Sequence, residues 1–143
     1  MSPRPLRPAS AVVAAIGLGI AGYLTAVHYD GGAPVCAISH GCATVQQSEY
    51  AELAGVPVAL LGVLGYAAIL LTLLSDGEAA RTATAFLALA GVGFSGWLTY
   101  VEVVKLDAIC IWCVGSAVCM VLLAVLSAAR ALSASPASAP LSR

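Results

Sequence analysis

The chain has 143 residues, of which 61% are hydrophobic and 9% are charged, and its formal net charge is -1. Ordinary globular domains carry roughly 25% charged residues, so this composition excludes most soluble classes and indicates an integral membrane protein. A nearly neutral chain also lacks the basic face that a polyanion requires, which excludes nucleic acid as a partner.

Four apolar segments are long enough to be membrane helices. A hydrocarbon core of about 30 Å is crossed by about 20 apolar residues in helical form. Little of the chain remains outside these segments, so we predict one domain over residues 1–143 with an all-α fold, an integral membrane four-helix bundle. The expected spans cover residues 9–27, 56–74, 83–104 and 109–132.

Positive charges are divided unequally between the two ends of this bundle. Five arginines fall on one side of four spans, and only Lys105 falls on the other. The positive-inside rule makes the arginine side cytoplasmic, so both termini of this multi-pass protein of the cell (inner) membrane are predicted in the cytoplasm. The loops after the first and third spans then lie outside the cytoplasm, where disulfides persist. The arginines are Arg4, Arg7, Arg81, Arg130 and Arg143.

The first external loop carries one cysteine pair, Cys36 and Cys42. A dithiol on a water-facing loop can meet a soluble partner and exchange disulfides with it through thiolate attack. Beyond this pair, Thr44 and Gln47 have capping-box spacing. We therefore predict a short interfacial helix over residues 45–54 in the first extracytoplasmic loop.

The second pair, Cys110 and Cys113, forms a C-x-x-C motif at the start of the last span. We expect Asp107 to cap that helix, which places Cys110 in the first turn, where free N–H groups and the helix dipole favour a thiolate. Three-residue spacing puts both sulfurs on nearly the same helix face. The motif is therefore the best candidate for redox catalysis.

The two halves of the chain resemble each other. Residues 17–25 read GLGIAGYLT and residues 91–99 read GVGFSGWLT, and the same offset carries Cys36 onto Cys110. We predict a pseudo-repeat of helix, external cysteine pair and helix. Its glycine-rich faces can pack within the bundle or between chains, so the oligomeric state stays open.

Two further residues receive structural interpretations. Glu102 would be costly deep in lipid, and we expect it to form an interfacial ion pair with Lys105. Cys119 is expected to behave as a small buried hydrophobe.

In combination, these motifs resemble the vitamin K epoxide reductase family, specifically its small bacterial members. The features are four spans, C-x5-C in the first external loop, Ser48 six residues beyond Cys42, GVPVALLGVLGY at residues 55–66, and C-I-W-C opening the last span. The resemblance covers most of the chain, from Gly17 to about Met120.

The resemblance implies a quinone-dependent thiol oxidase, an enzyme that acts on dithiols for disulfide bond formation. Cys36 and Cys42 would exchange with an exported thioredoxin-fold thiol oxidase, a separate protein. Cys42 would then bridge to Cys110, and Cys113 would face a quinone of the membrane pool, of menaquinone, ubiquinone or phylloquinone type. Ser48 would donate a hydrogen bond near a quinone oxygen.

The chain departs from animal members of the family at two positions. They carry an Asn in the second span, near Val58 here, and a Tyr four residues after the C-x-x-C motif, where Ala117 stands; this chain has no Asn. An ordinary respiratory quinone is therefore expected rather than vitamin K epoxide.

Paired cysteines also fit other classes. A thiol-based heavy-metal binding or carrier protein is the alternative, since zinc can take four thiolates, although a metal site is not expected at the edge of a membrane without a polar surround. Two locked structural disulfides would serve a purely structural protein. The unrelated four-span quinone-linked oxidases place C-x-x-C in the first loop, whereas here it lies in the second.

Overall fold

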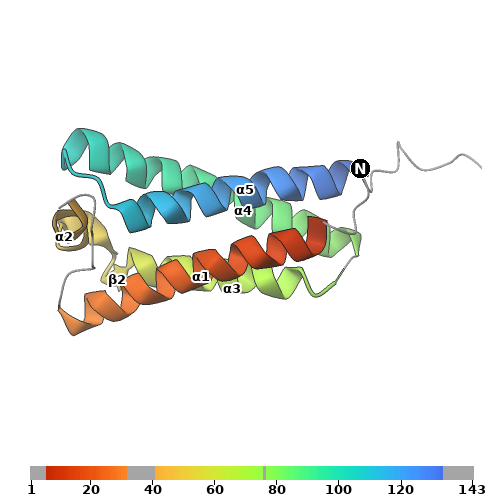
Figure 1. The fold of residues 1–143 in the computed structure, drawn as a ribbon, viewed down its shortest axis with the longest axis horizontal. Coiled ribbons are helices and arrows are strands. Elements are labelled where there is room, and N and C mark those ends of the chain that lie inside the picture. The colour runs from red at the N-terminus through yellow and green to blue at the C-terminus, as the bar shows by residue number, and fades with distance from the viewer. Residues whose placement is uncertain (1–5, 32–40, 76, 134–143) are drawn as a thin grey trace, which may run out of the picture.

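The computed structural model describes residues 6–31, 41–75 and 77–133 and shows a bundle of four helices (Figure 1). Helix α1 packs on α3 and α5, and α4 packs on the same two neighbours. The predicted all-α bundle is confirmed. The helices are α1 (Leu6–Asp30), α3 (Val58–Thr72), α4 (Glu78–Tyr100) and α5 (Ile111–Ser133).

Three helical segments are long and apolar enough to cross a membrane: Leu6–Asp30, Glu78–Lys105 and Ile111–Leu132. Helix α3 has 15 residues and is apolar but shorter. Large aliphatic and aromatic side chains cover the outside of the bundle, where they suit a lipid surround. Those that are more than half exposed include Val12, Ile16, Leu64, Phe86, Leu89 and Val125.

Small residues bring the helices close together in the core. A Cβ at Gly17 would overlap the ring of Tyr66 on α3, and a Cβ at Gly91 would overlap the side chain of Met120 on α5. These two glycines begin the two similar nine-residue segments, so this element of the repeat is used for packing within the bundle. Cys119 is buried in the same core, as predicted.

The two ends of the bundle differ. Figure 1 shows the start of α1 and the end of α5 at one end, and α2 (Gly41–Gln46), the following segment and the start of α5 at the other. The segment that contains Cys42 and the C-x-x-C motif therefore share one end of the bundle. Cys36 lies outside the described residues.

The connection between α1 and α3 contains a short helix, as predicted, but this helix is α2 (Gly41–Gln46) rather than residues 45–54. Helix α2 stops at Gln46, and the N–H and Oγ of Ser48 both donate to the Val45 carbonyl, at 3.3 and 2.8 Å. A 3-10 turn, η1 (Glu49–Ala51), and two antiparallel strands, β1 (Glu52–Leu53) and β2 (Val56–Pro57), follow.

The hairpin between these strands delays the start of α3. Its two turn residues, Ala54 and Gly55, have φ values of 56° and 85°, the left-handed conformation that a tight two-residue hairpin requires. The predicted span over residues 56–74 therefore begins as helix only at Val58.

Helix α4 ends in a π-helix, η2 (Val101–Lys105). The Leu106 N–H donates to the Val101 carbonyl, and the Ala108 N–H donates to the Glu102 carbonyl, both at 2.9 Å. This wider turn leads the chain to the start of α5.

Candidate active site

A thiol caps the helix that carries the C-x-x-C motif. The Cys110 carbonyl accepts a hydrogen bond from the Val114 N–H at 2.9 Å. The Cys110 Sγ accepts a second one, from the Cys113 N–H at 3.3 Å, as an N-cap side chain does. The prediction that Asp107 caps this helix was wrong: with a φ of 49°, Asp107 turns the chain in the left-handed region before the helix begins at Ile111.

The two sulfurs of the motif lie side by side. Both cysteines are reduced, and the Cys113 thiol donates a hydrogen bond to the Cys110 Sγ at 2.8 Å. This bond is the main influence that lowers the pKa of the Cys110 thiol, which lies just outside the α5 span; the backbone N–H groups of Cys113 and Trp112 add to it. Burial and the charge of Glu102 oppose the shift without reversing it. Cys110 is therefore predisposed to ionise.

Glu102 reaches both cysteines from η2, and sequence reasoning missed it. Its side chain is 3% exposed, and its Oε2 accepts a hydrogen bond from the Cys110 N–H at 3.0 Å. The carboxyl group also lies beside the Cys113 side chain, and both line the same cavity. The predicted ion pair with Lys105 was wrong, because Glu102 is buried against α5 while Lys105 is exposed.

The burial of Glu102 follows from the inward face of α4. Residues that alternate three- and four-residue spacing along a helix share one face, and Glu102 continues such a series at the π-helical end. π-helical turns occur frequently at functional sites. This spacing could have identified Glu102 in the sequence as an inward-facing carboxylate. The series is Thr84, Ala88, Gly91, Ser95, Leu98 and Glu102, all buried or half-buried.

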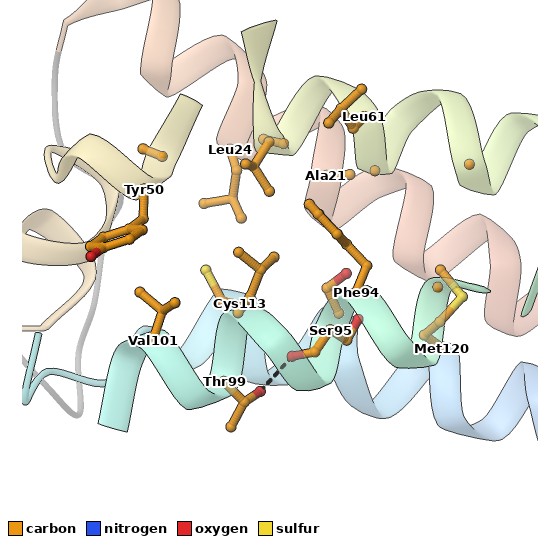
Figure 2. A pocket seen from close by; sticks show the side chains of 18 of the residues that line it. Ala21, Leu24, Tyr50, Leu61, Phe94, Ser95, Thr99, Val101, Cys113 and Met120 are labelled. Carbon is orange, nitrogen blue, oxygen red and sulfur yellow. Dashed lines mark hydrogen bonds between the residues drawn. The ribbon is translucent and has the colours of Figure 1, made fainter. Parts of the chain in front are cut away.

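A cavity of about 300 Å³ lies within the bundle beside the motif. Its walls are mostly apolar, and its volume is at the lower end of the range for small-molecule pockets, roughly 300 to 1,000 Å³. Figure 2 shows Cys113 among Leu24, Phe94 and Tyr50 around the same space. Glu102 also lines this cavity. One thiol of the motif and one carboxyl group therefore face a common apolar space.

Two other polar side chains in the cavity wall already have hydrogen-bond partners. The hydroxyl of Ser48 donates to the Val45 carbonyl at 2.8 Å, and that of Tyr66 donates to the Ser116 carbonyl at 2.7 Å. The structure places Ser48 in the wall, while its role toward a quinone stays a prediction. Val58 lines the same cavity.

The segment that begins with Gly41 and Cys42 packs against the segment before the C-x-x-C motif through its backbone. Cys42 is the second residue of α2, described through its backbone alone. Its predecessor Gly41 lies directly against the backbone of Ile109, where a Cβ would overlap the Ile109 nitrogen and carbonyl group. Because Cys42 and Cys110 follow these two residues, the two cysteine-bearing segments lie in contact.

These features define a class: an α-helical membrane protein with a reduced dithiol beside an apolar cavity. Comparison with known families matches residues 8–128 to the model of the Vitamin K epoxide reductase family. The match covers most of the chain, which therefore belongs to the vitamin K epoxide reductase family. No individual curated protein matches it. Family membership makes the protein an oxidoreductase of the quinone-linked thiol class.

Proposed function

We propose that the protein is a quinone-dependent thiol oxidase that supplies disulfides to a separate extracytoplasmic thioredoxin-fold protein. The observation that carries this proposal is the position of the C-x-x-C motif: its sulfurs are 2.8 Å apart, and Cys113 lines the apolar cavity. An apolar-walled space beside a dithiol suits a lipid-soluble ring acceptor.

Electrons enter through the first pair, Cys36 and Cys42. The partner's dithiol is oxidised as the Cys36–Cys42 disulfide is reduced. When the second pair is oxidised, the Cys42 thiolate attacks Cys110 of the Cys110–Cys113 disulfide and releases Cys113, and Cys36 then displaces Cys110 from Cys42, so that the first pair is again a disulfide and the second pair is a dithiol. The contact of Gly41 with Ile109 supports this transfer, because it holds the two segments together at the required residues.

The second pair reduces the quinone. Cys110 and Cys113 lose two electrons and two protons as their S–S bond forms, and the quinone takes up two electrons and two protons to become a quinol. Cys113 faces the acceptor and passes the electron pair to it, so that quinol is released as the Cys110 sulfur, whose thiolate is favoured by its hydrogen bonds, bonds to the Cys113 sulfur. Both pairs face outside the cytoplasm, in agreement with the arginine-rich opposite end.

Anaerobic quinone reduction by the purified protein tests the proposal. The substrate is a reduced thioredoxin-fold dithiol, and Cys36, Cys42, Cys110 and Cys113 are each changed to Ala. Cys113→Ala and Cys110→Ala should abolish turnover with any dithiol, whereas the first-pair variants should abolish it only with the protein partner. Cys119→Ala is the matched control, since the Cys119 side chain is buried in the core and does not line the cavity. Full activity of Cys113→Ala would refute the proposal.

A further inference from the structure

Glu102 is the single buried carboxylate among the described residues. A buried carboxyl group is costly unless it has partners, and this one is placed beside the reacting sulfurs. Its backbone is fixed by the π-helix and by the hydrogen bond from the Ala108 N–H. Its Oε2 is fixed by the Cys110 N–H. The carboxyl group is thus held in one place beside the C-x-x-C motif.

We propose that Glu102 is the proton acceptor for the Cys113 thiol and the donor of that proton to the reduced quinone. This inference rests on the proposed function and adds a catalytic residue to it. The carboxyl group contacts the Cys113 thiol and lines the cavity that the thiol faces. It therefore touches both the group that loses the proton and the space where the proton is taken up.

A proton carrier beside the dithiol fits the proton balance of the reaction. Oxidation of the dithiol releases two protons, and reduction of the quinone consumes two. Glu102 takes the Cys113 proton as the thiolate forms, holds it as a neutral carboxylic acid, and gives it to a ring oxygen. The second proton is the one that Cys110 releases to water as it ionises, and the quinol takes up a proton from water in its place. With a carboxylate inside the bundle, the thiol proton can reach the quinone without first exchanging with bulk water.

No other group in the described cavity wall is equally placed. Apart from Glu102 and Cys113, the titratable side chains in this wall are Tyr50 on η1 and Tyr66 on α3, and the Tyr66 hydroxyl is engaged with Ser116. On the segment of Glu102 itself, Lys105 and Asp107 are exposed. The groups of the last segment that act on the carboxyl are the backbone of Cys110, just before α5, and the side chain of Cys113 in its first turn.

Glu102→Gln separates proton transfer from positioning. The amide oxygen of Gln can still accept the Cys110 N–H bond, and the side chain keeps its size, but it cannot take a proton from a thiol. We expect the first turnover of prereduced protein with a quinone to slow by about 100-fold near pH 7, the lower range for loss of a general base. Glu78→Gln, an exposed glutamate at the opposite end of the bundle, is the control and should leave the rate unchanged.

A second readout needs no quinone. The charge of Glu102 opposes ionisation of Cys110, so Glu102→Gln should move the midpoint of Cys110 alkylation to lower pH. The midpoint is measured by mass spectrometry of protein labelled with iodoacetamide at a series of pH values. A merely structural role would leave the first turnover unchanged in this conservative variant, whereas the midpoint shift tests that the carboxylate charge acts on Cys110. Glu102→Ala in the presence of added formate should recover part of the lost rate, since a small acid can carry the proton.

The outcomes are distinct. Wild-type quinone reduction together with an unchanged first-turnover rate in Glu102→Gln would overturn the proton role and leave the proposed function standing. A wild-type protein that reduces no quinone would overturn the proposed function and this inference with it. Slow first turnover, an acid-shifted Cys110 midpoint and formate recovery together support the inference.

Discussion

A methyl group at Gly41 tests whether the two cysteine pairs communicate through the contact between α2 and the segment before α5. The Cβ of Gly41→Ala would meet the nitrogen, carbonyl carbon and carbonyl oxygen of Ile109, all within 3 Å. Real Cβ atoms do not approach backbone so closely, and backbone yields at greater cost than a flexible side chain. We estimate the local cost at about 1 to 3 kcal/mol, as for other overpacked sites.

The chain can relieve this overlap by moving α2 away from Ile109, which separates Cys42 from Cys110. A misplacement of about 1 Å can slow a reaction by about 100-fold, and we expect a decrease of this size in quinone reduction driven by a thioredoxin-fold dithiol. Reduction driven by a small dithiol that reaches Cys110 and Cys113 directly should change little. Gly22→Ala is the matched control, because a Cβ there meets nothing within 4 Å. Equal losses with both dithiols would refute this reasoning.

Three further predictions concern the packing and ionisation of the site. Tyr66→Phe removes the hydrogen bonds to Ser116 and should lower the free energy of unfolding in detergent by about 1 kcal/mol. Thermal unfolding measures this loss, and Tyr29→Phe is the control because Tyr29 is 66% exposed. Gly17→Ala makes a methyl group overlap the buried Tyr66 ring and should lower the free energy of unfolding by about 1 to 3 kcal/mol. A methyl group at Gly19 meets open space, so Gly19→Ala should leave the stability nearly unchanged. Equal stability of the two variants would contradict the packing argument. Because the pKa of Cys110 is lowered, its thiolate persists as the pH falls below the ordinary thiol range, and its alkylation should remain fast there. Cys113→Ala removes the main cause of the lowered pKa and should move the alkylation midpoint to higher pH. An unchanged midpoint in this variant would count against the Cys113 hydrogen bond as the cause.

The membrane bundle could be predicted because hydrophobic length alone determines it. Each predicted span corresponds to a helix, and the bounds differ by a few residues where polar ends continue the helix, as at Asp30 on α1. The adjacency of the two sulfurs of C-x-x-C was also predictable, because helical spacing sets it. These properties depend on local sequence.

The predictions that were wrong concern residues whose surroundings are set by tertiary contacts. Asp107 has the right side chain for a cap, but the π-helix before it turns the chain so that Cys110 takes the cap position. Glu102 was paired with Lys105 by their spacing in sequence, whereas in the structure its carboxyl group accepts a hydrogen bond from the N–H of Cys110, the residue before α5. Neither outcome is visible until the ends of α4 and α5 are brought together.

The short length of α3 explains why the site lies at this end of the bundle. Fifteen helical residues span about 22 Å, less than the roughly 30 Å of a hydrocarbon core. The segment between α1 and α3 therefore has to complete the bundle on the cysteine side, and Ser48 with Tyr50 and Ala51 of η1 line the cavity beside the side chains of α3. A longer α3 would fill this space with helix. The early turn at Ala54 and Gly55 thus leaves an apolar space of ligand size next to Cys113 and Glu102.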